Sequence, residues 1–327
     1  MSGNLLEGLP SGAPRAASRK LRYADVAVTA TAKEFAGIYR GKKQHESDIP
    51  AMLDRALVAG CEKIMLTGMS LHDVDFNLEI AKSHPGQCFI TVGCHPYHAK
   101  EVEGEDGYLD KLSTRIQELL AMQPCPLAAF GELGLDYDHL DYASKEVQQR
   151  AFRLQLDLAV KVNLPLFLHC RSAFADFRDI LAPYMPRLQR KGLVHSFVGS
   201  EAEMIALIDL GLHISVNGFT FKTNESLRMV ASIPLGCLHI ETDAPWGIIQ
   251  PSSDVAKRYL VHAPEAPSSK KRDKFEMGYM VKDRFESCLI ERVALIVAGL
   301  KGLTVDEVAD NAWRNSTSMF RLDKESD

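Results

Sequence analysis

Eight short apolar runs, rich in aliphatic and β-branched residues, are distributed along the chain. Runs of this kind between turn residues predict buried strands. In chain order they cover residues 23–30, 63–68, 88–96, 127–136, 164–170, 192–197, 212–218 and 237–243. The stretches between them repeat apolar residues with a helical period, which predicts helices near 47–59, 72–84, 106–122, 145–162, 173–190, 200–210 and 223–232.

Each predicted strand is followed by a helix or by a longer excursion. Parallel strands require such crossover connections, so the alternation predicts an α/β fold with a parallel sheet. Eight units that close on themselves form a (β/α)₈ TIM barrel, which typically takes ~250 residues. A doubly wound open sheet is the alternative, but no GxGxxG follows the first strand and no GxxxxGK(S/T) occurs anywhere. Residues 250–276 are expected to form a loop-like excursion, and a helical region over 278–320 to complete the outer layer.

The composition of the 327 residues is that of a globular protein, with 46% hydrophobic and 25% charged residues. We expect one TIM-barrel hydrolase domain over residues 23–322 and a C-terminal tail over 323–327. Residues 1–22 carry four basic residues among Gly, Pro, Ser and Ala, and we expect a disordered N-terminal tail there. A mitochondrial presequence is the alternative, although the amphipathic period of this segment is poor.

The net charge of −5 excludes a global basic field that would draw the chain to nucleic acid or to an anionic membrane. A polyanionic substrate would need local positive charge, which bound metal ions can supply. The seven cysteines include no CxxC pair and mostly lie in apolar runs, as is typical of reduced thiols. No apolar segment approaches the ~20 residues of a membrane span, so no membrane partner is expected. We expect the cytoplasm or the nucleus as the compartment, with mitochondria as a minor alternative.

Polar residues mark nearly every predicted strand at or near its carboxyl end. In a TIM barrel these ends converge on the face where chemistry takes place. The residues concerned are Asp25, His95, Glu132, His169, His195, Asn217 and Asp243. A single histidine after an apolar run is more often a satisfied core residue, but such endings on several successive strands favour one shared site.

Glutamate, histidine and aspartate from separate strands form a mixed nitrogen and oxygen ligand set. Such a set suits Zn²⁺, Mn²⁺ or Fe, and its carboxylates also accept Mg²⁺. It lacks the thiolates of a structural zinc site, because Cys170 points to the opposite face of its strand from His169. One or two bound ions could activate water for hydrolysis. The last strand ends in Glu241 and Asp243, which share one face because they lie two residues apart.

Five motifs lie at these strand ends, namely GCHP (93–96), GELGLDYD (131–138), LHCR (168–171), VHSF (194–197) and ETDAPW (241–246). In combination they resemble the motifs of the TatD-type metal-dependent deoxyribonucleases. The segment FAGIYRGKKQHESD (35–48) resembles the eukaryotic TatD-related branch in particular. The resemblance extends over residues 23–320.

The resemblance implies a TIM barrel of the metal-dependent hydrolase type that cleaves DNA phosphodiester bonds, often as a 3′-to-5′ exonuclease. It also implies two divalent ions, Mg²⁺ or Mn²⁺ for activity, with Zn²⁺ as an alternative. By motif, Glu132 would bridge the two ions and Asp243 would bind one of them. His169 and His195 would bind the other ion. Glu132 and Asp243 would also be the catalytic residues.

Further residues take supporting roles in the same interpretation. His95, Arg171 and Asn217 would contact the substrate, where a guanidinium can hold a phosphate through two hydrogen bonds. Glu241 and Asp25 would support the ligands from behind. The implied partner is DNA, held through metal-bridged phosphate, and no obligate protein partner is implied.

Two departures from the family pattern leave alternatives open. The TatD branch usually has Asp-x-Gly-x-Asn on strand 1, where this chain has Ala27 and Thr29 in place of the glycine and the asparagine. RFES (284–287) stands where the family commonly has Arg-Asn-Glu-Pro, and Glu286 is retained. These changes support one alternative, a catalytically weakened metal-binding regulatory protein. The other is an amidohydrolase acting on a small cyclic amide, lactone or amino-sugar, although such enzymes usually keep an HxH pair on strand 1. The basic run Lys270–Arg272 predicts either phosphate contacts or a solvated loop.

Overall fold

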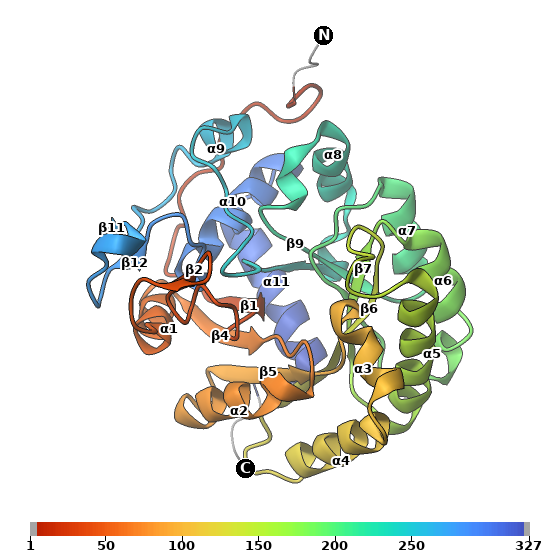
Figure 1. Cartoon of the computed structure of the whole chain (residues 1–327). Helices are drawn as coiled ribbons and strands as arrows, with labels where there is room; N and C mark the ends of the chain where they lie inside the picture. The colour runs from red at the N-terminus through yellow and green to blue at the C-terminus, as the bar shows by residue number, and fades with distance from the viewer. Residues whose placement is uncertain (1–4, 324–327) are drawn as a thin grey trace. The chain divides into compact units, whose positions relative to one another are not determined.

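A computed structural model describes residues 5–323 of the chain (Figure 1). Its main sheet has eight strands that neighbour one another in chain order, and the pairs from β5 to β9 are parallel. All eight predicted strands are therefore confirmed. They are β1 (Tyr23–Val28), β4 (Cys61–Leu66), β5 (Cys88–Val92), β6 (Leu127–Asp136), β7 (Leu166–Arg171), β8 (Gly192–Val194), β9 (His213–Val216) and β10 (Leu238–Ile240).

Helices occupy all seven of the predicted stretches between strands. They are α1 (Ile49–Val58), α2 (Val74–Ser83), α4 (Tyr108–Leu120), α5 (Lys145–Val162), α6 (Phe174–Leu181), α7 (Glu201–Asp209) and α8 (Asn224–Ser232). Helix α6 ends at Leu181, earlier than predicted, because Pro183 has no backbone N–H to continue the helical hydrogen bonds. The helical region expected over 278–320 begins later and contains two helices, α10 (Ile290–Lys301) and α11 (Val305–Phe320). The break lies at Gly302, whose φ of 66° ends α10.

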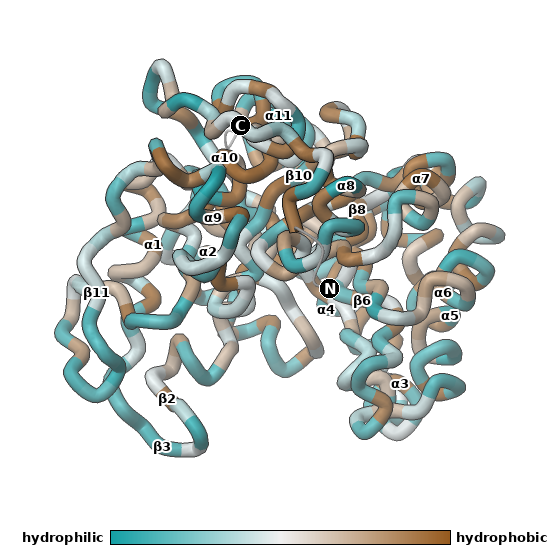
Figure 2. Tube along the Cα trace, turned by 90° about the horizontal axis from the view of Figure 1, so that it is seen from above, coloured by the Kyte–Doolittle hydropathy of each residue, from teal (hydrophilic) through white to brown (hydrophobic). Residues whose placement is uncertain are grey.

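Several short elements escape the sequence pattern because they are too short to show a hydrophobic period. They are β2 (Ile38–Tyr39), β3 (Lys42–Lys43), α3 (Ala99–Gly104), α9 (Asp254–Tyr259), β11 (Ser269–Lys270) and β12 (Met280–Val281). Strands β2 and β3 form an antiparallel hairpin, and the two exposed lysines of β3 have the hydrophilic colour in Figure 2. Helix α9 lies in the segment expected to be loop-like, where Ser253 caps it by accepting a hydrogen bond from the backbone of Ala256. Within residues 5–323, no helix combines the length and the apolar character that crossing a membrane requires.

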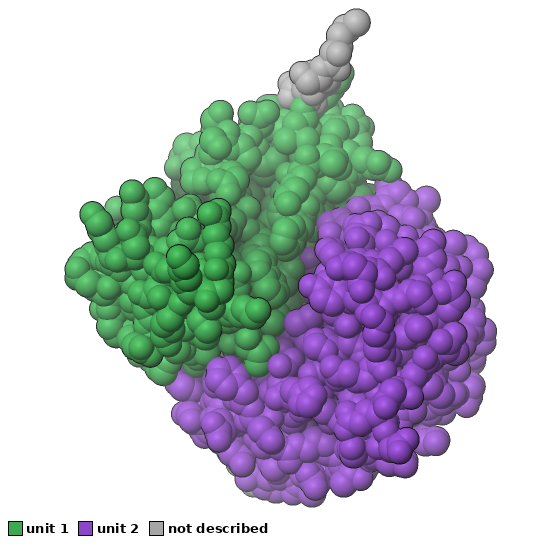
Figure 3. Space-filling view, in the orientation of Figure 1, with its two compact units in different colours: residues 1–64, 216–316 green, residues 65–215, 317–327 purple. Residues whose placement is uncertain are grey.

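The chain divides into two compact units (Figure 3). Unit 1 comprises the chain up to Ile64 together with Val216–Ser316, and unit 2 comprises Met65–Ser215 together with the C-terminal end from Thr317. The boundaries between them fall inside β4, inside β9 and inside α11. In unit 1, the backbone carbonyl of Pro10 accepts a 2.7 Å hydrogen bond from the Tyr259 hydroxyl. The division into a domain over 23–322 and two tails stays a prediction.

Helix α5 provides much of the apolar packing of unit 2. The Ser144 side chain caps its first turn, and Asn163 ends it in the left-handed conformation with φ 41°. Its buried residues recur every three or four positions, which places them on one face of the helix. On that face Phe152 stacks on Phe177 of α6, with the ring centroids 5.3 Å apart. Gln148 and Gln155 are buried on the same face.

Strands β1 and β10 meet within unit 1. Val28 and Ala244 form a parallel bridge, and the amide of Thr29 donates a 2.8 Å hydrogen bond to the carbonyl of Ala244. The end of β1 is therefore bridged to the segment after β10, inside the ETDAPW motif.

Unit 1 also buries a network of four charged side chains. Arg284 donates two hydrogen bonds to Asp48, at 2.7 and 2.6 Å, and one to Glu286 at 2.7 Å. Arg55 donates to the same two carboxylates, each at 3.0 Å. Two guanidinium groups thus balance two carboxylates. The RFES segment supplies two of these four charged residues, Arg284 and Glu286.

We expect Arg284→Met to lower the free energy of unfolding by about 3–5 kcal/mol, because it leaves two buried carboxylates with one cation between them. Urea denaturation measures the loss. The matched control is Arg178→Met, which removes an exposed arginine paired with the exposed Asp179 and should cost less than about 1 kcal/mol. Equal losses in the two variants would contradict a stabilising role for the buried network.

Candidate metal centre

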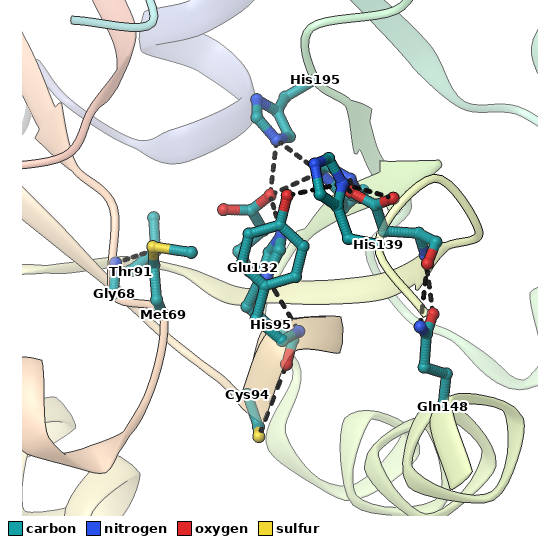
Figure 4. A network of polar contacts seen from close by, with 12 residues as sticks. Gly68, Met69, Thr91, Cys94, His95, Glu132, His139, Gln148 and His195 are labelled. Atoms are coloured by element: carbon teal, nitrogen blue, oxygen red, sulfur yellow. Dashed lines mark hydrogen bonds and ion pairs between the residues drawn. The ribbon is translucent and has the colours of Figure 1, made fainter. Parts of the chain in front are cut away.

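Three histidine side chains surround one carboxylate oxygen in unit 2 (Figure 4). Glu132 Oε1 lies 2.6 Å from His195 Nε2 and 2.8 Å from His169 Nδ1. His95 Nε2 lies 3.3 Å from the same oxygen. All four side chains are nearly or fully buried, and they come from β6, the end of β7 and the segments that follow β5 and β8.

A second carboxylate supports this cluster from behind. Asp136 Oδ2 lies 3.2 Å from His169 Nε2, on the side of the ring opposite to the nitrogen that faces Glu132. The half-exposed His139 contacts the same carboxylate through Nδ1 at 3.1 Å. The site residues predicted from the sequence do not include Asp136. The sequence feature that could have identified Asp136 is its position four residues after Glu132. Residues an even number of positions apart on a strand lie on the same face, so this spacing predicts that both carboxylates face the site.

Glycine at position 134 lets β6 and β7 approach closely at the site. Gly134 pairs with His169 in the sheet and has φ 150°, a conformation that residues with a side chain rarely adopt. A Cβ atom at this position would lie 1.9 Å from the carbonyl oxygen of His169. The second glycine of the GELG motif therefore preserves the backbone position of a candidate ligand.

Two buried glutamines on α5 hold the strand ends that carry the site. Gln155 accepts a hydrogen bond from the amide of Cys94 at 2.8 Å and donates to its carbonyl at 2.9 Å. Gln148 makes the same pair of hydrogen bonds with the backbone of Asp136, both at 2.8 Å (Figure 4). Each glutamine thus fixes one peptide segment beside a candidate site residue, namely His95 or Asp136 itself.

The electrostatics of the cluster favour an ionised glutamate. Burial raises the pKa of Glu132, but the charges and hydrogen bonds of the histidines outweigh it and hold the pKa well below its usual value. Burial lowers the pKa of His95 to about 4 against the pull of Glu132, so His95 is neutral at pH 7 and keeps a lone pair. Burial also lowers the pKa of His169, but the hydrogen bonds that its ring donates to Asp136 and Glu132 give a net rise.

The donor set fits a divalent metal ion. One ligand atom from each of His95, Glu132 and His169 lies within 4.8 Å of the others. Imidazole and carboxylate groups together suit Zn²⁺ or Mn²⁺. Asp136 on the far nitrogen of His169 matches the way in which metal-binding histidines are commonly held by a carboxylate. Three ring nitrogens directed at one oxygen are also more donors than its two lone pairs can accept in good geometry.

Unit 1 holds the other predicted carboxylates. Asp25 is fully buried and accepts hydrogen bonds from the hydroxyl and the amide of Thr242, at 2.5 and 2.9 Å. Asn217 donates a 2.8 Å hydrogen bond to Glu241 and accepts one from the amide of Phe219. Asp243 follows β10 with φ 53°, a left-handed conformation that aspartate tolerates and that recurs at functional sites.

The predicted site residues therefore fall into two groups. Unit 2 brings together Glu132, His169 and His195, and it adds His95 to the candidate ligands. Arg171 ends β7 and is partly buried. Unit 1 contains Asp25, Asn217, Glu241 and Asp243. The roles assigned to these residues from the sequence stay predictions.

Residues 26–321 match the family described as TatD related DNase. The chain belongs to the TatD-related DNase family. The resemblance and the expected enzyme class, a hydrolase that acts on ester bonds, are confirmed. The match spans the whole main sheet apart from the first residues of β1.

Relatives and solved structures agree with this membership. A Schizosaccharomyces pombe protein named deoxyribonuclease Tat-D is 40% identical over 307 residues, which cover 92% of this chain and 96% of the relative. An Erwinia amylovora protein named 3′-5′ ssDNA/RNA exonuclease TatD is 31% identical, with 91% and 99% of the two chains covered.

A structure from Saccharomyces cerevisiae, described as an uncharacterized amidohydrolase, superposes with a TM-score of 0.85 at 30% identity and covers 92% of this chain and all of its own. A TatD family hydrolase from Entamoeba histolytica gives a TM-score of 0.84 at 30% identity, with 93% and 99% covered. The predicted TIM-barrel fold of the metal-dependent hydrolase type is thereby confirmed. The compartment stays a prediction.

Buried Asp25 gives the metal-free protein a pH-dependent stability. Burial raises its pKa from the usual 3.8 to about 7, although the hydroxyl and the amide of Thr242 donate hydrogen bonds that lower it. Between these two values the folded state holds a proton that the unfolded state has lost, so the free energy of unfolding falls as the pH rises. Above pH 7 the dependence on Asp25 ends.

We expect Asp25→Asn to remove this component, so that the stability difference between variant and wild type changes by on the order of 4 kcal/mol between pH 4 and pH 7. Urea denaturation in EDTA at several pH values measures it. Asp54→Asn, at an exposed position of α1, serves as the control. A constant difference between Asp25→Asn and wild type across this range would contradict a protonated, buried Asp25.

Proposed function

We propose that the protein is a metal-dependent deoxyribonuclease that hydrolyses DNA phosphodiester bonds and removes nucleotides from 3′ ends. The observation that carries the proposal is the buried Glu132 carboxylate with three histidine nitrogens within 3.3 Å of one oxygen. The names of the similar deoxyribonucleases and 3′-5′ exonucleases support the choice of substrate and of polarity. An acidic chain needs local positive charge to bind a polyanion, and a metal centre supplies it.

The proposed metal ligands are those that the sequence motifs imply. Glu132, His169 and His195 would hold one divalent ion, with His95, which clusters with Glu132 and His169, available as a further nitrogen ligand. Asp243 would be a ligand of a second ion, for which the sequence motifs also imply Glu132. A bound ion of this kind lowers the pKa of a water molecule and offsets negative charge on the phosphate. Mg²⁺ and Mn²⁺ are the proposed ions for activity, with Zn²⁺ as an alternative.

Each protein group has a separate task in the proposed reaction. Asp243 accepts a proton from the attacking water, a role that a carboxylate at a strand end can fill. Asp136 keeps the His169 ring oriented through its 3.2 Å contact. Arg171, at the end of β7, contacts a phosphate oxygen of the substrate. Asn217 holds Glu241 in place rather than leaving it free to rotate.

We expect the protein to release mononucleotides from a single-stranded oligonucleotide labelled at its 3′ end when Mg²⁺ or Mn²⁺ is present, and none in EDTA. Glu132→Ala and Asp243→Ala should each lower the rate by at least about 100-fold, because each removes a metal ligand or proton acceptor. Gel electrophoresis of 3′-labelled and 5′-labelled strands reports the rate and the polarity.

The control for this experiment is Asp110→Ala, which removes an exposed carboxylate from the first turn of α4 and should keep the wild-type rate. Release that does not depend on metal, or that survives both site variants, would sink the proposal. An inactive protein that still binds metal would instead favour the regulatory alternative.

We expect Asp136→Asn to weaken metal binding by about 10–100-fold, because the amide no longer stabilises the required orientation of His169. Isothermal titration with Zn²⁺ or Mn²⁺ measures the affinity and the number of ions bound. The matched control is Asp138→Asn, which changes an exposed aspartate two residues further along the chain and should leave the affinity unchanged. Equal affinities for Asp136→Asn and wild type would contradict the proposal that Asp136 orients His169 for metal binding.

A further inference from the structure

A large pocket in unit 1 lies outside the histidine cluster. Its volume is about 1100 Å³, and it is lined by three segments that are far apart in the sequence. These are the β2–β3 hairpin, the turn that follows β10, and the segment from β11 to β12. Phe219 and Lys222, after β9, complete the lining. No role was assigned to this pocket by the motifs of the metal centre.

The charge of the pocket is opposite to that of the whole chain. Six basic residues line it against three acidic ones, Glu34, Asp273 and Asp283, whereas the chain carries −5 overall. The basic residues are Arg40, Lys42, Lys222, Lys271, Arg272 and Lys282. Across residues 5–323 none of these six forms an ion pair, although the adjacent Lys43 and Lys270 are paired with Glu46 and Glu276. Unpaired cations gathered around one pocket indicate an anionic ligand.

Aromatic rings stand among these cations. Arg272 lies 5.2 Å above the ring of Tyr39, and Lys222 lies 4.5 Å above the ring of Phe219. Trp246 also lines the pocket, and its side chain remains 39% exposed. Half-exposed aromatic rings between basic side chains are the arrangement by which proteins bind single-stranded nucleic acid, since bases stack on the rings and phosphates meet the cations.

The backbone fixes Trp246 beside a proposed ligand in the same unit. The amide of Trp246 donates a 2.9 Å hydrogen bond to the carbonyl of Asp243, so the indole and this carboxylate belong to one tight turn. Gly218 packs against the next residue, because a Cβ atom there would lie 1.9 Å from the carbonyl oxygen of Gly247. The turn after β10 and the segment after β9 are therefore held in direct backbone contact.

We propose that this pocket binds a segment of single-stranded nucleic acid without any metal ion. One unpaired base stacks on Trp246, and the phosphates on its flank meet Lys271, Arg272 and Lys282. A base inside a duplex has no free face, so the pocket selects unpaired strands. The proposal rests on the proposed function for the identity of the polyanion, but it concerns binding alone.

The experiment measures binding in EDTA, where metal-dependent hydrolysis does not take place. A fluorescein-labelled twelve-nucleotide oligothymidylate is titrated with the full-length protein, and anisotropy gives the affinity at several KCl concentrations. The triple variant Lys271→Ala, Arg272→Ala, Lys282→Ala should reduce the slope of log K against log[KCl] by about 2, at roughly 0.7 for each cation removed. The matched control removes the exposed Lys82, Lys100 and Lys161 of unit 2 and should keep the wild-type slope.

Trp246 offers a second and independent readout. Trp246→Ala should weaken binding by about 5-fold to 150-fold, and Trp246→Phe should restore most of the affinity because a phenyl ring still stacks. The chain has two tryptophans, and the other one, Trp313, is only 6% exposed. Oligothymidylate should therefore quench the tryptophan emission of the wild type but not that of Trp246→Phe. Matching urea midpoints would show that the variants are folded.

The outcomes separate this proposal from the proposed nuclease. If the wild type cleaves DNA with metal but the pocket variants bind oligothymidylate in EDTA like the wild type, the pocket proposal is overturned and the nuclease stands. If the variants lose binding while the wild type shows no metal-dependent cleavage, the nuclease fails and the pocket proposal stands. Equal affinity for a duplex of the same length would also overturn the pocket proposal.

Discussion

Two amide side chains on one face of α5 carry the geometry of the histidine cluster. Gln148 and Gln155 lie seven residues apart, which is about two helical turns, and each forms a closed pair of hydrogen bonds with one peptide segment. A buried glutamine that lost its partners would carry a desolvation cost of about 1–3 kcal/mol, so the strand ends have little freedom to shift. The packed helix thereby fixes the backbone positions of Cys94 and Asp136. Cys94 precedes His95 in the chain, and Asp136 contacts His169, so both histidines are positioned as well.

Buried carboxylates in both units likewise need partners, and the kind of partner decides whether they are ionised. In unit 2, Glu132 is ionised because ring nitrogens surround it, and in unit 1 two arginines balance Asp48 and Glu286. Asp25 has only hydrogen-bond donors and no cation, so burial raises its pKa. Buried carboxylates in this fold thus differ in protonation according to whether a cation or a hydroxyl faces them. The −5 net charge conceals these local balances and also the basic pocket of unit 1.

The sequence predicted the regular part of the fold and much of the site. Hydrophobic runs located the eight strands, and helical periodicity located α5 to the residue. Polar residues at strand ends indicated Glu132, His169 and His195, which the structure brings together. The hairpin β2–β3 and the strands β11 and β12 were missed, because two-residue strands have no period to detect.

Other parts of the site and the fold could not be predicted, because they depend on contacts between residues far apart in the sequence. Asp136 was visible only as a second acid on the same strand, and its role depends on the ring of His169 from the next strand. The basic run at 270–272 was ambiguous in the sequence, since its meaning depends on Trp246 and on a hairpin more than 200 residues earlier in the chain. Arg55 and Arg284 are likewise 229 positions apart and meet at the same two carboxylates.

The division of the chain into two units has a consequence for its synthesis. Unit 2 takes most of its residues from one uninterrupted stretch, Met65–Ser215, which contains every histidine of the cluster, whereas unit 1 needs segments from both sides of that stretch. Domains form as units while the chain leaves the ribosome from its N-terminus. The whole histidine cluster, together with Glu132, is therefore translated before Asp243 and before the second segment of unit 1.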